Sequence, residues 1–112
     1  MSGISTHVLD TAKGLPAHGV RVKLERQSAG AGWFEVGGGS TDNNGRISEL
    51  LEGAEQLEAG VYRLTFFIAD YFHGQESFYP EVCVQFEVRD ASRHYHVPLL
   101  LSPYGYTTYR GS

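Results

Sequence analysis

The sequence predicts an all-β fold, an antiparallel β-sandwich of about eight short strands with one short helix. Its 112 residues are 41% hydrophobic, which is enough for one core and too little for two domains. Apolar and polar residues alternate along several short segments, as in strands with one buried face. Clusters of turn-forming residues separate these segments. A single domain is therefore expected over residues 1–112.

Three segments alternate most clearly and are expected to be strands: residues 20–26, 61–68 and 82–89. Their apolar positions share one face, which in the last two segments consists of Tyr62, Leu64, Phe66 and Ile68, and of Val82, Val84, Phe86 and Val88. Further strands are expected at residues 4–9, 33–41, 46–48, 93–101 and 106–109.

Turn and helix signals complete the chain. Glycine, proline, asparagine and aspartate mark turns or loops at residues 13–16, 30–32, 37–39, 42–45 and 102–105. Residues 69–75 are expected to form the one short helix. The acidic residues 53–58 are expected to form a turn-rich connection.

The composition excludes several functional classes. A net charge of -4, without a cluster of lysine and arginine, argues against nucleic acid as a partner. The N-terminus lacks a basic and apolar leader, and no apolar run is long enough to span a bilayer, so we expect a soluble cytoplasmic protein with no membrane partner. The three consecutive glycines from Gly37 lack the lysine of a phosphate-binding loop. The lone Cys83 is expected to be an ordinary, buried strand residue rather than a reactive thiol.

Residues 93–101 have two different faces. Tyr95, Val97, Leu99 and Leu101 form a continuous apolar face that is expected to lie in the core. The outer face then carries His94, His96, Pro98 and Leu100. Because this face is partly apolar, it predicts a groove or an interface rather than a fully solvent-exposed surface. Pro98 has no N–H for a ladder, so the strand should be at an edge or irregular there.

Four segments together resemble one family, the transthyretin-like 5-hydroxyisourate hydrolases: residues 6–10, 44–46, 95–106 and 109–112. The resemblance covers essentially the whole chain, and its most specific part is the ending Tyr109-Arg110-Gly111-Ser112. It implies a transthyretin-like, or prealbumin-like, sandwich. It also implies a hydrolase of urate degradation that converts 5-hydroxyisourate to 2-oxo-4-hydroxy-4-carboxy-5-ureidoimidazoline, by attack of water on the ring lactam carbonyl.

The chain is also similar to transthyretin, the hormone carrier, in the first strand and the last hairpin. It differs where the carrier lines its channel with lysine, glutamate and threonine, because His7, Arg46 and His96 stand there. The resemblance implies a homotetramer, a dimer of dimers with sites at the dimer–dimer interface. The outer face of the last two strands would line this channel, together with Thr107, Tyr109 and Gly111, which share one parity.

The resemblance assigns catalysis to His7, Arg46, His96 and Ser112. Histidine titrates near neutral pH, so either His7 or His96 is expected to activate water. The other would orient the substrate or donate a proton to the leaving nitrogen, and the sequence does not choose between them. Arg46 is expected to bind the ring carbonyls and to stabilise the oxyanion.

The substrate-binding set comprises His7, Arg46, Tyr109, Arg110, Gly111 and Ser112. Ser112 is expected to supply a hydroxyl and, in a chain that ends there, a carboxylate. No cofactor or metal is expected. Two residues on one face, His94 and His96, could bind zinc, but no third ligand has a clear spacing.

Two other functions remain open. One is a carrier of an aromatic ligand in the same channel, which the histidine and arginine set and the end of the chain at Ser112 oppose. The other is a secreted interaction module, for which a signal peptide and paired cysteines would be expected. His18 and His73 are expected to be structural or exposed.

Overall fold

The computed structural model describes residues 3–30, 32–53 and 55–112. The elements are β1 (Gly3–Asp10), β2 (Leu15–Pro16), β3 (Arg21–Gln27), β4 (Trp33–Ser40), β5 (Arg46–Ile47), β6 (Gly60–Phe67), α1 (Ile68–Tyr71), β7 (Val82–Val88), β8 (His94–Ser102) and β9 (Gly105–Thr108). The predicted turn at 30–32 includes Ala31 and the predicted connection at 53–58 includes Ala54. These two alanines and residues 1–2 lie outside the described residues.

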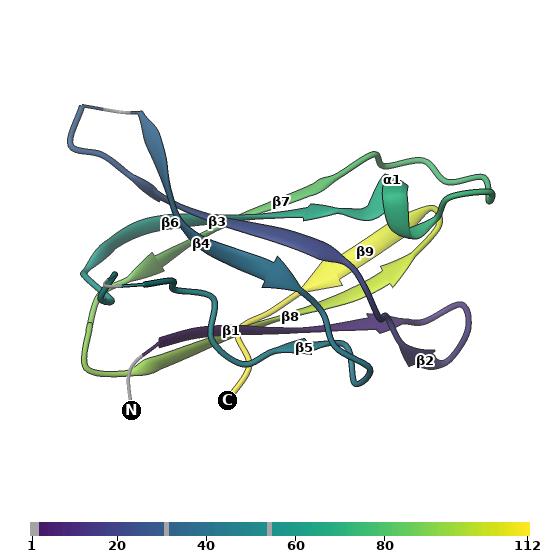
Figure 1. Ribbon diagram of the computed structural model, residues 1–112, viewed down its shortest axis with the longest axis horizontal. Coiled ribbons are helices and arrows are strands. Elements are labelled where there is room, and N and C mark those ends of the chain that lie inside the picture. Colours follow the sequence, from purple (N-terminus) through teal and green to yellow (C-terminus); the bar gives the residue numbers. More distant parts are fainter. Residues whose placement is uncertain (1–2, 31, 54) are drawn as a thin grey trace.

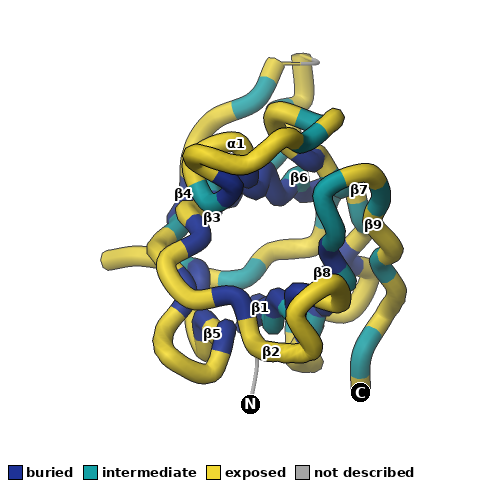
Figure 2. Tube along the Cα trace, turned by 90° about the vertical axis from the view of Figure 1, so that its right-hand side faces the viewer, coloured by how far each residue is buried: buried dark blue, intermediate teal, exposed yellow. Residues whose placement is uncertain are grey.

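The strands form two facing sheets (Figure 1). The first sheet has the order β2-β1-β8-β9, with β5 also paired to β1, and the second has the order β4-β3-β6-β7. The buried positions line the space between them (Figure 2). As predicted, the core includes Tyr62, Leu64, Phe66 and Ile68 from one side and Tyr95, Val97, Leu99 and Leu101 from the other. The all-β sandwich expected from the sequence is confirmed.

One pairing departs from the antiparallel pattern. β1 and β8 run parallel over eight residue pairs, from Gly3↔His94 to Asp10↔Leu101, whereas the other strand pairs are antiparallel. Parallel strands need a long crossover, which the intervening chain provides by building the second sheet. The pairing therefore joins the two ends of the sequence in the middle of the first sheet.

The helix is shorter than expected. It covers Ile68–Tyr71 rather than residues 69–75, and the turn that follows it includes Gly74, where φ is 82°. The Tyr71 hydroxyl donates to Oδ2 of Asp10 at 2.7 Å and ties the helix to β1. Burial, followed by this carboxylate, raises the pKa of Tyr71 to about 12. No helix in the described ranges has the length and apolar character needed to cross a membrane.

The predicted turn at residues 13–16 contains a strand. Leu15 and Pro16 form β2 and pair with Asp10 and Leu9 at the end of β1. Only two residues pair, so alternation could not reveal this strand.

The three glycines at residues 37–39 lie in β4, and the prediction of a turn there is wrong. A side chain on Gly37 would overlap the carbonyl oxygen of Leu50. The same carbonyl accepts a hydrogen bond from the N–H of Gly38 at 2.9 Å. The glycines therefore admit a neighbouring segment against the strand rather than reversing the chain.

Pro98 was expected at an edge strand or at an irregularity, and the structure shows the second, because β8 is an internal strand. The ladder between β8 and β9 stops at Leu99↔Thr108 and resumes only at the isolated bridge His96↔Gly111. Between them the carbonyl of Pro98 accepts from the Thr108 hydroxyl at 2.7 Å. A side-chain hydrogen bond thus replaces the ladder beside the proline.

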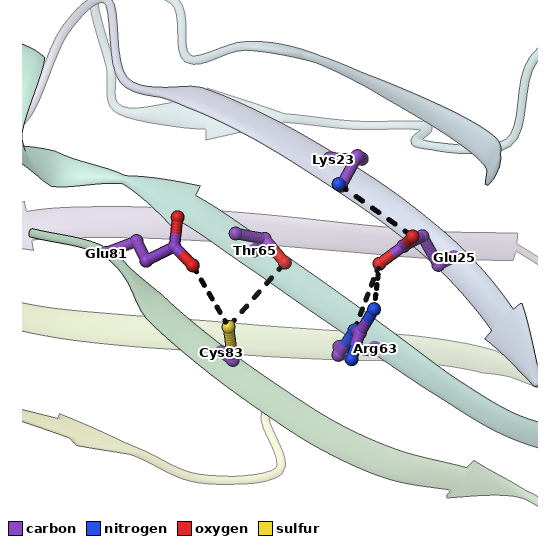
Figure 3. Close-up of polar contacts among 6 residues, drawn as sticks. All are labelled: Lys23, Glu25, Arg63, Thr65, Glu81 and Cys83. Atoms are coloured by element: carbon purple, nitrogen blue, oxygen red, sulfur yellow. Dashed lines mark hydrogen bonds and ion pairs between the residues drawn. The ribbon is translucent and has the colours of Figure 1, made fainter. Parts of the chain in front are cut away.

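The outer face of the second sheet is polar (Figure 3). Arg63 donates to Oε1 of Glu25 through Nε and Nη2, at 3.0 and 2.8 Å. Cys83 lies near Thr65 on this face, with its sulfur 3.8 Å from the hydroxyl. Cys83 is exposed, so the expected burial is wrong. It is on the solvent side of an edge strand, opposite the face that carries Val82 and Val88.

We predict that Gly37→Ala lowers the free energy of unfolding by about 1–3 kcal/mol, because the added methyl collides with the Leu50 backbone. Urea denaturation measures this loss. Gly30→Ala is the matched control, since its methyl would meet no atom of the described residues within 4 Å, and a change below about 1 kcal/mol is expected. Equal effects of the two substitutions would contradict the close approach at Gly37.

Candidate active site

The outer face of the first sheet carries a hollow of about 410 Å³. Its lining residues come from β1, β5, β8 and the C-terminal tail: Ser5, Thr6, His7, Arg46, Ile47, Ser48, His94, His96 and Ser112. The four residues expected to be catalytic, His7, Arg46, His96 and Ser112, are all among them. The structure therefore brings that set together.

Strand register explains the grouping. Arg46 of β5 lies directly opposite His7 of β1, and His7 is in turn level with Pro98 of β8. Two residues earlier on β1, Ser5 is level with His96. Because alternate residues of a strand share a face, Ser5 and His7 lie on the same outer surface as His96.

His7 is held by the loop that precedes β5. Its Nε2 lies 2.9 Å from the backbone oxygen of Asn44, which can only accept, so Nε2 carries a hydrogen. In neutral His7 the lone pair is then on Nδ1. Asp42 shapes this loop, because its Oδ1 accepts from the N–H groups of Arg46 and Asn44 at 3.0 and 2.8 Å. These hydrogen bonds, that of Arg46 first, lower the pKa of Asp42.

His96 is half-buried, and one of its two ring nitrogens is engaged. Nδ1 lies 2.8 Å from the hydroxyl of Ser5, and the same hydroxyl lies 2.8 Å from Nε2 of His94. Nε2 of His96 has no hydrogen-bond partner among the described residues. Every buried side-chain nitrogen in those residues has a partner, so Nε2 is not buried. Nε2 is therefore the accessible nitrogen.

The surroundings of His96 favour its neutral form. Burial lowers its pKa most, and the positive charges of His7, His94 and Arg46 lower it further. At neutral pH the imidazole is thus uncharged and carries a lone pair that can accept a proton.

Arg46 offers free donors to the hollow. Its backbone is fixed by Asp42, while its exposed guanidinium forms no ion pair or hydrogen bond with any residue that the structure describes. A planar group with five N–H donors suits adjacent carbonyl oxygens or a developing negative charge.

The C-terminal tail returns to His96. Gly111 donates its N–H to the backbone oxygen of His96 at 2.8 Å, in an isolated bridge. It packs so closely that a Cβ on Gly111 would lie 2.5 Å from Cδ2 of His96 and 3.1 Å from Cγ of Pro98. Glycine therefore lets the tail lie across the histidine, and Ser112 reaches the hollow.

Tyr109 and Arg110 are not part of this hollow. They line a second one, of about 240 Å³, between β7 and the end of β9, and His96 borders both. The Arg110 guanidinium lies 4.9 Å from the centre of the Tyr95 ring. Because β9 ends at Thr108, its parity does not extend to Tyr109. Thr107 is opposite Leu100, on the outer face as expected.

Two elements of the site were missed by sequence reasoning. The hydroxyl of Ser5 and the backbone oxygen of Asn44 hold the two histidines. Ser5 has the same parity as His7, which was an available signal, but its pairing with a strand some ninety residues away was not. His18 and His73 are exposed and lie outside the hollow, as expected.

Comparison with known proteins gives a consistent result. Residues 4–111 match the model of the HIUase/Transthyretin family. A 5-hydroxyisourate hydrolase of Mus musculus is 47% identical over 114 residues, which cover 99% of this chain and 96% of the relative. One of Salmonella dublin is 45% identical over 111 residues, covering 97% of this chain and 80% of the relative.

Solved structures agree. Klebsiella pneumoniae 5-hydroxyisourate hydrolase has a TM-score of 0.84 and 37% identity, covering 99% of this chain and all of that one. Sea bream transthyretin in complex with thyroxine has a TM-score of 0.88 and 36% identity, covering 96% and 93% of the two chains. The transthyretin-like form of the sandwich is confirmed. The chain belongs to the HIUase/Transthyretin family.

Proposed function

We propose that this protein hydrolyses 5-hydroxyisourate to 2-oxo-4-hydroxy-4-carboxy-5-ureidoimidazoline in urate degradation. Relatives with the name of this hydrolase match nearly the whole chain. The observation that carries the proposal is the meeting of His7, Arg46 and His96 in one hollow. Imidazoles beside a free guanidinium supply a base and an oxyanion donor, which hydrolysis requires.

His96 is assigned as the general base, acting through Nε2. This nitrogen is accessible, and the lowered pKa keeps the ring neutral at the pH where a base is needed. It takes a proton from water, and the hydroxide attacks the lactam carbonyl carbon. The proton is then available for the ring nitrogen that leaves when the C–N bond breaks.

The remaining residues of the hollow bind and polarise the substrate. The lone pair on Nδ1 of neutral His7 accepts a hydrogen bond from a ring N–H, and Asn44 fixes the orientation of that imidazole. Arg46 donates to the attacked carbonyl oxygen and stabilises the oxyanion. Ser112 supplies a hydroxyl from the C-terminal tail to the same hollow. No metal or cofactor takes part in this scheme.

The tail residues support the site in a different way. Arg110 packs on Tyr95, and this anchor keeps Gly111 against His96 and Ser112 in the hollow. Direct contact of Tyr109 and Arg110 with the substrate stays a prediction.

We further propose a homotetramer, a dimer of dimers with the active sites at the dimer–dimer interface. β7 and β9 are the terminal strands of the two sheets and lie on the same side of the molecule (Figure 2). Their adjacent free edges are suited to pairing with a second copy. The partly exposed Leu100 on the outer face suits the second contact. The cytoplasmic location stays a prediction.

We predict that the protein accelerates the decay of freshly generated 5-hydroxyisourate, followed by ultraviolet absorbance. His96→Ala should lower kcat about 100-fold or more because the base is lost. Arg46→Ala should do the same because an oxyanion donor is lost, and His7→Ala should also reduce activity strongly.

The control is His73→Ala, which removes an exposed imidazole outside the hollow and should leave the rate unchanged. Unfolding curves of the variants should overlay that of the wild type. If 5-hydroxyisourate decays at its spontaneous rate and the protein binds thyroxine tightly, the hydrolase function is wrong and a carrier function is favoured.

The pH at which His96 takes up a proton should lie below 6.5, the ordinary pKa of histidine, because burial and nearby positive charge lower the pKa of His96. As pH falls through that lowered value, His96 becomes protonated and kcat/KM declines. In His7→Ala one positive neighbour is gone, so the titration of His96 followed by NMR should move to higher pH. An NMR titration midpoint of His96 above pH 6.5 in the wild type would contradict these electrostatic effects.

The mass in solution, measured by light scattering, should equal four chains of 12.4 kDa. A fully active monomer would show that the hollow works alone and would disprove the proposed interface.

A further inference from the structure

We propose that Ser5 is a positioning residue that couples the protonation of His94 to the tautomer of His96. The proposal deepens the hydrolase function above, in which His96 is the base. It rests on the geometry of three side chains on the outer face of β1 and β8.

Ser5 stands between the two histidines as a shared partner. Its hydroxyl lies 2.8 Å from Nε2 of His94 and 2.8 Å from Nδ1 of His96. The side chain is held in place, because Ser5 is only 8% exposed and is paired in register with His96. No other hydrogen-bond partner of this hydroxyl is present in the described part of the chain. Its one proton therefore goes to one of the two histidines.

A hydroxyl can donate one hydrogen bond and accept others, so the two contacts must differ in direction. In the first arrangement His94 donates from Nε2 to Ser5, and Ser5 donates to Nδ1 of His96. Neutral His96 then carries its hydrogen on Nε2 and is an acid toward the hollow. In the second arrangement His96 donates from Nδ1 to Ser5, and Ser5 donates to His94. Nε2 of His96 is then a base.

The protonation state of His94 limits which of these arrangements is possible. His94 is exposed and exchanges protons with solvent. When it is protonated, both of its nitrogens are donors, so only the first arrangement is possible for neutral His96. The base form of His96 consequently requires neutral His94.

The same contacts provide a route for the proton during the reaction. His96 in its base form takes a proton from water at Nε2 and becomes positively charged. Its Nδ1 proton moves to the oxygen of Ser5 while the hydroxyl proton of Ser5 moves to Nε2 of His94. The charge ends on exposed His94, hydroxide remains for the attack, and His96 is left neutral with a hydrogen on Nε2. When that hydrogen passes to the leaving nitrogen, the relay runs back: Nδ1 of His96 regains a proton from the Ser5 hydroxyl, and protonated His94 returns its own to Ser5.

The charges around His96 favour this transfer. His7, on β1, and Arg46, on β5, both disfavour a positive charge on His96, as does its burial. His94 is the most exposed of the three histidines that line the hollow, so solvent screens a charge there best. Ser112, on the C-terminal tail, also lines the hollow.

Kinetics of Ser5 variants provide the first test. Ser5→Ala should lower kcat about 10- to 100-fold with KM nearly unchanged, because the general base loses its orientation while the binding groups remain. Ser5→Thr, which keeps the hydroxyl, should restore most of the rate. The matched control Ser40→Ala removes an exposed serine of β4, on the other sheet, and should have no effect. A Ser5→Ala enzyme within two-fold of wild type would overturn the proposal.

A double mutant separates positioning from simple packing. If Ser5 and His94 act as one unit, Ser5→Ala combined with His94→Ala should be no slower than the slower single variant. Multiplicative losses would mean that the two residues act independently, and the coupling would be wrong.

NMR of ¹⁵N-labelled histidine tests the coupling without any substrate. When His94 is protonated, the tautomer of neutral His96 with its hydrogen on Nδ1 should be lost in favour of the Nε2 tautomer in the wild type, and this loss should be absent in Ser5→Ala. A His96 tautomer that ignores His94 overturns the proposal even in an active hydrolase. If this loss is present but 5-hydroxyisourate decays at its spontaneous rate, the hydrolase function fails and the coupling stands.

Discussion

The parallel pairing of β1 with β8 is the constraint on which the candidate site depends. It sets Ser5 level with His96 and His7 level with Pro98, although these residues come from opposite ends of the chain. A shift of one residue would turn one set of side chains from the outer surface to the core, because alternate residues face opposite ways. The register is fixed by the buried face, where Ile4 and Val8 pack with Val97 and Leu99. Core packing thus determines which polar groups meet outside.

Around this pairing, many of the contacts that hold the functional residues involve the backbone. The Asn44 carbonyl orients His7, Asp42 fixes the loop that precedes Arg46, and Gly111 allows the tail to bridge to His96. Such contacts leave the reactive atoms free, since neither the guanidinium of Arg46 nor Nε2 of His96 has a partner among the described residues. A site with fixed backbones and unengaged donors is preorganised for a ligand.

Much of the fold could be predicted from the sequence, because alternation is a local property. The two faces of β8 and the core face of β6 followed from it, whereas the expected burial of Cys83 came from the usual behaviour of free cysteine and was wrong. The register of β1 on β8 could not, since it depends on contacts between distant segments. For the same reason Gly37 suggested a turn, although it makes room for Leu50. The grouping of His7, Arg46 and His96 came from family resemblance, whereas the bridging hydroxyl of Ser5 required the structure.

The central claim is that one hollow on the outer face of the first sheet holds the purine-like substrate between Arg46 and the two histidines. The most direct test is a crystal structure with bound uric acid, which shares the fused ring system of the substrate but lacks the hydroxyl on C5. The ring should lie in this hollow, with a carbonyl oxygen within hydrogen-bond distance of the Arg46 guanidinium and Nε2 of His96 facing the ring. A ring bound instead in the groove beside Tyr109 and Arg110, away from Arg46 and His7, would contradict the account.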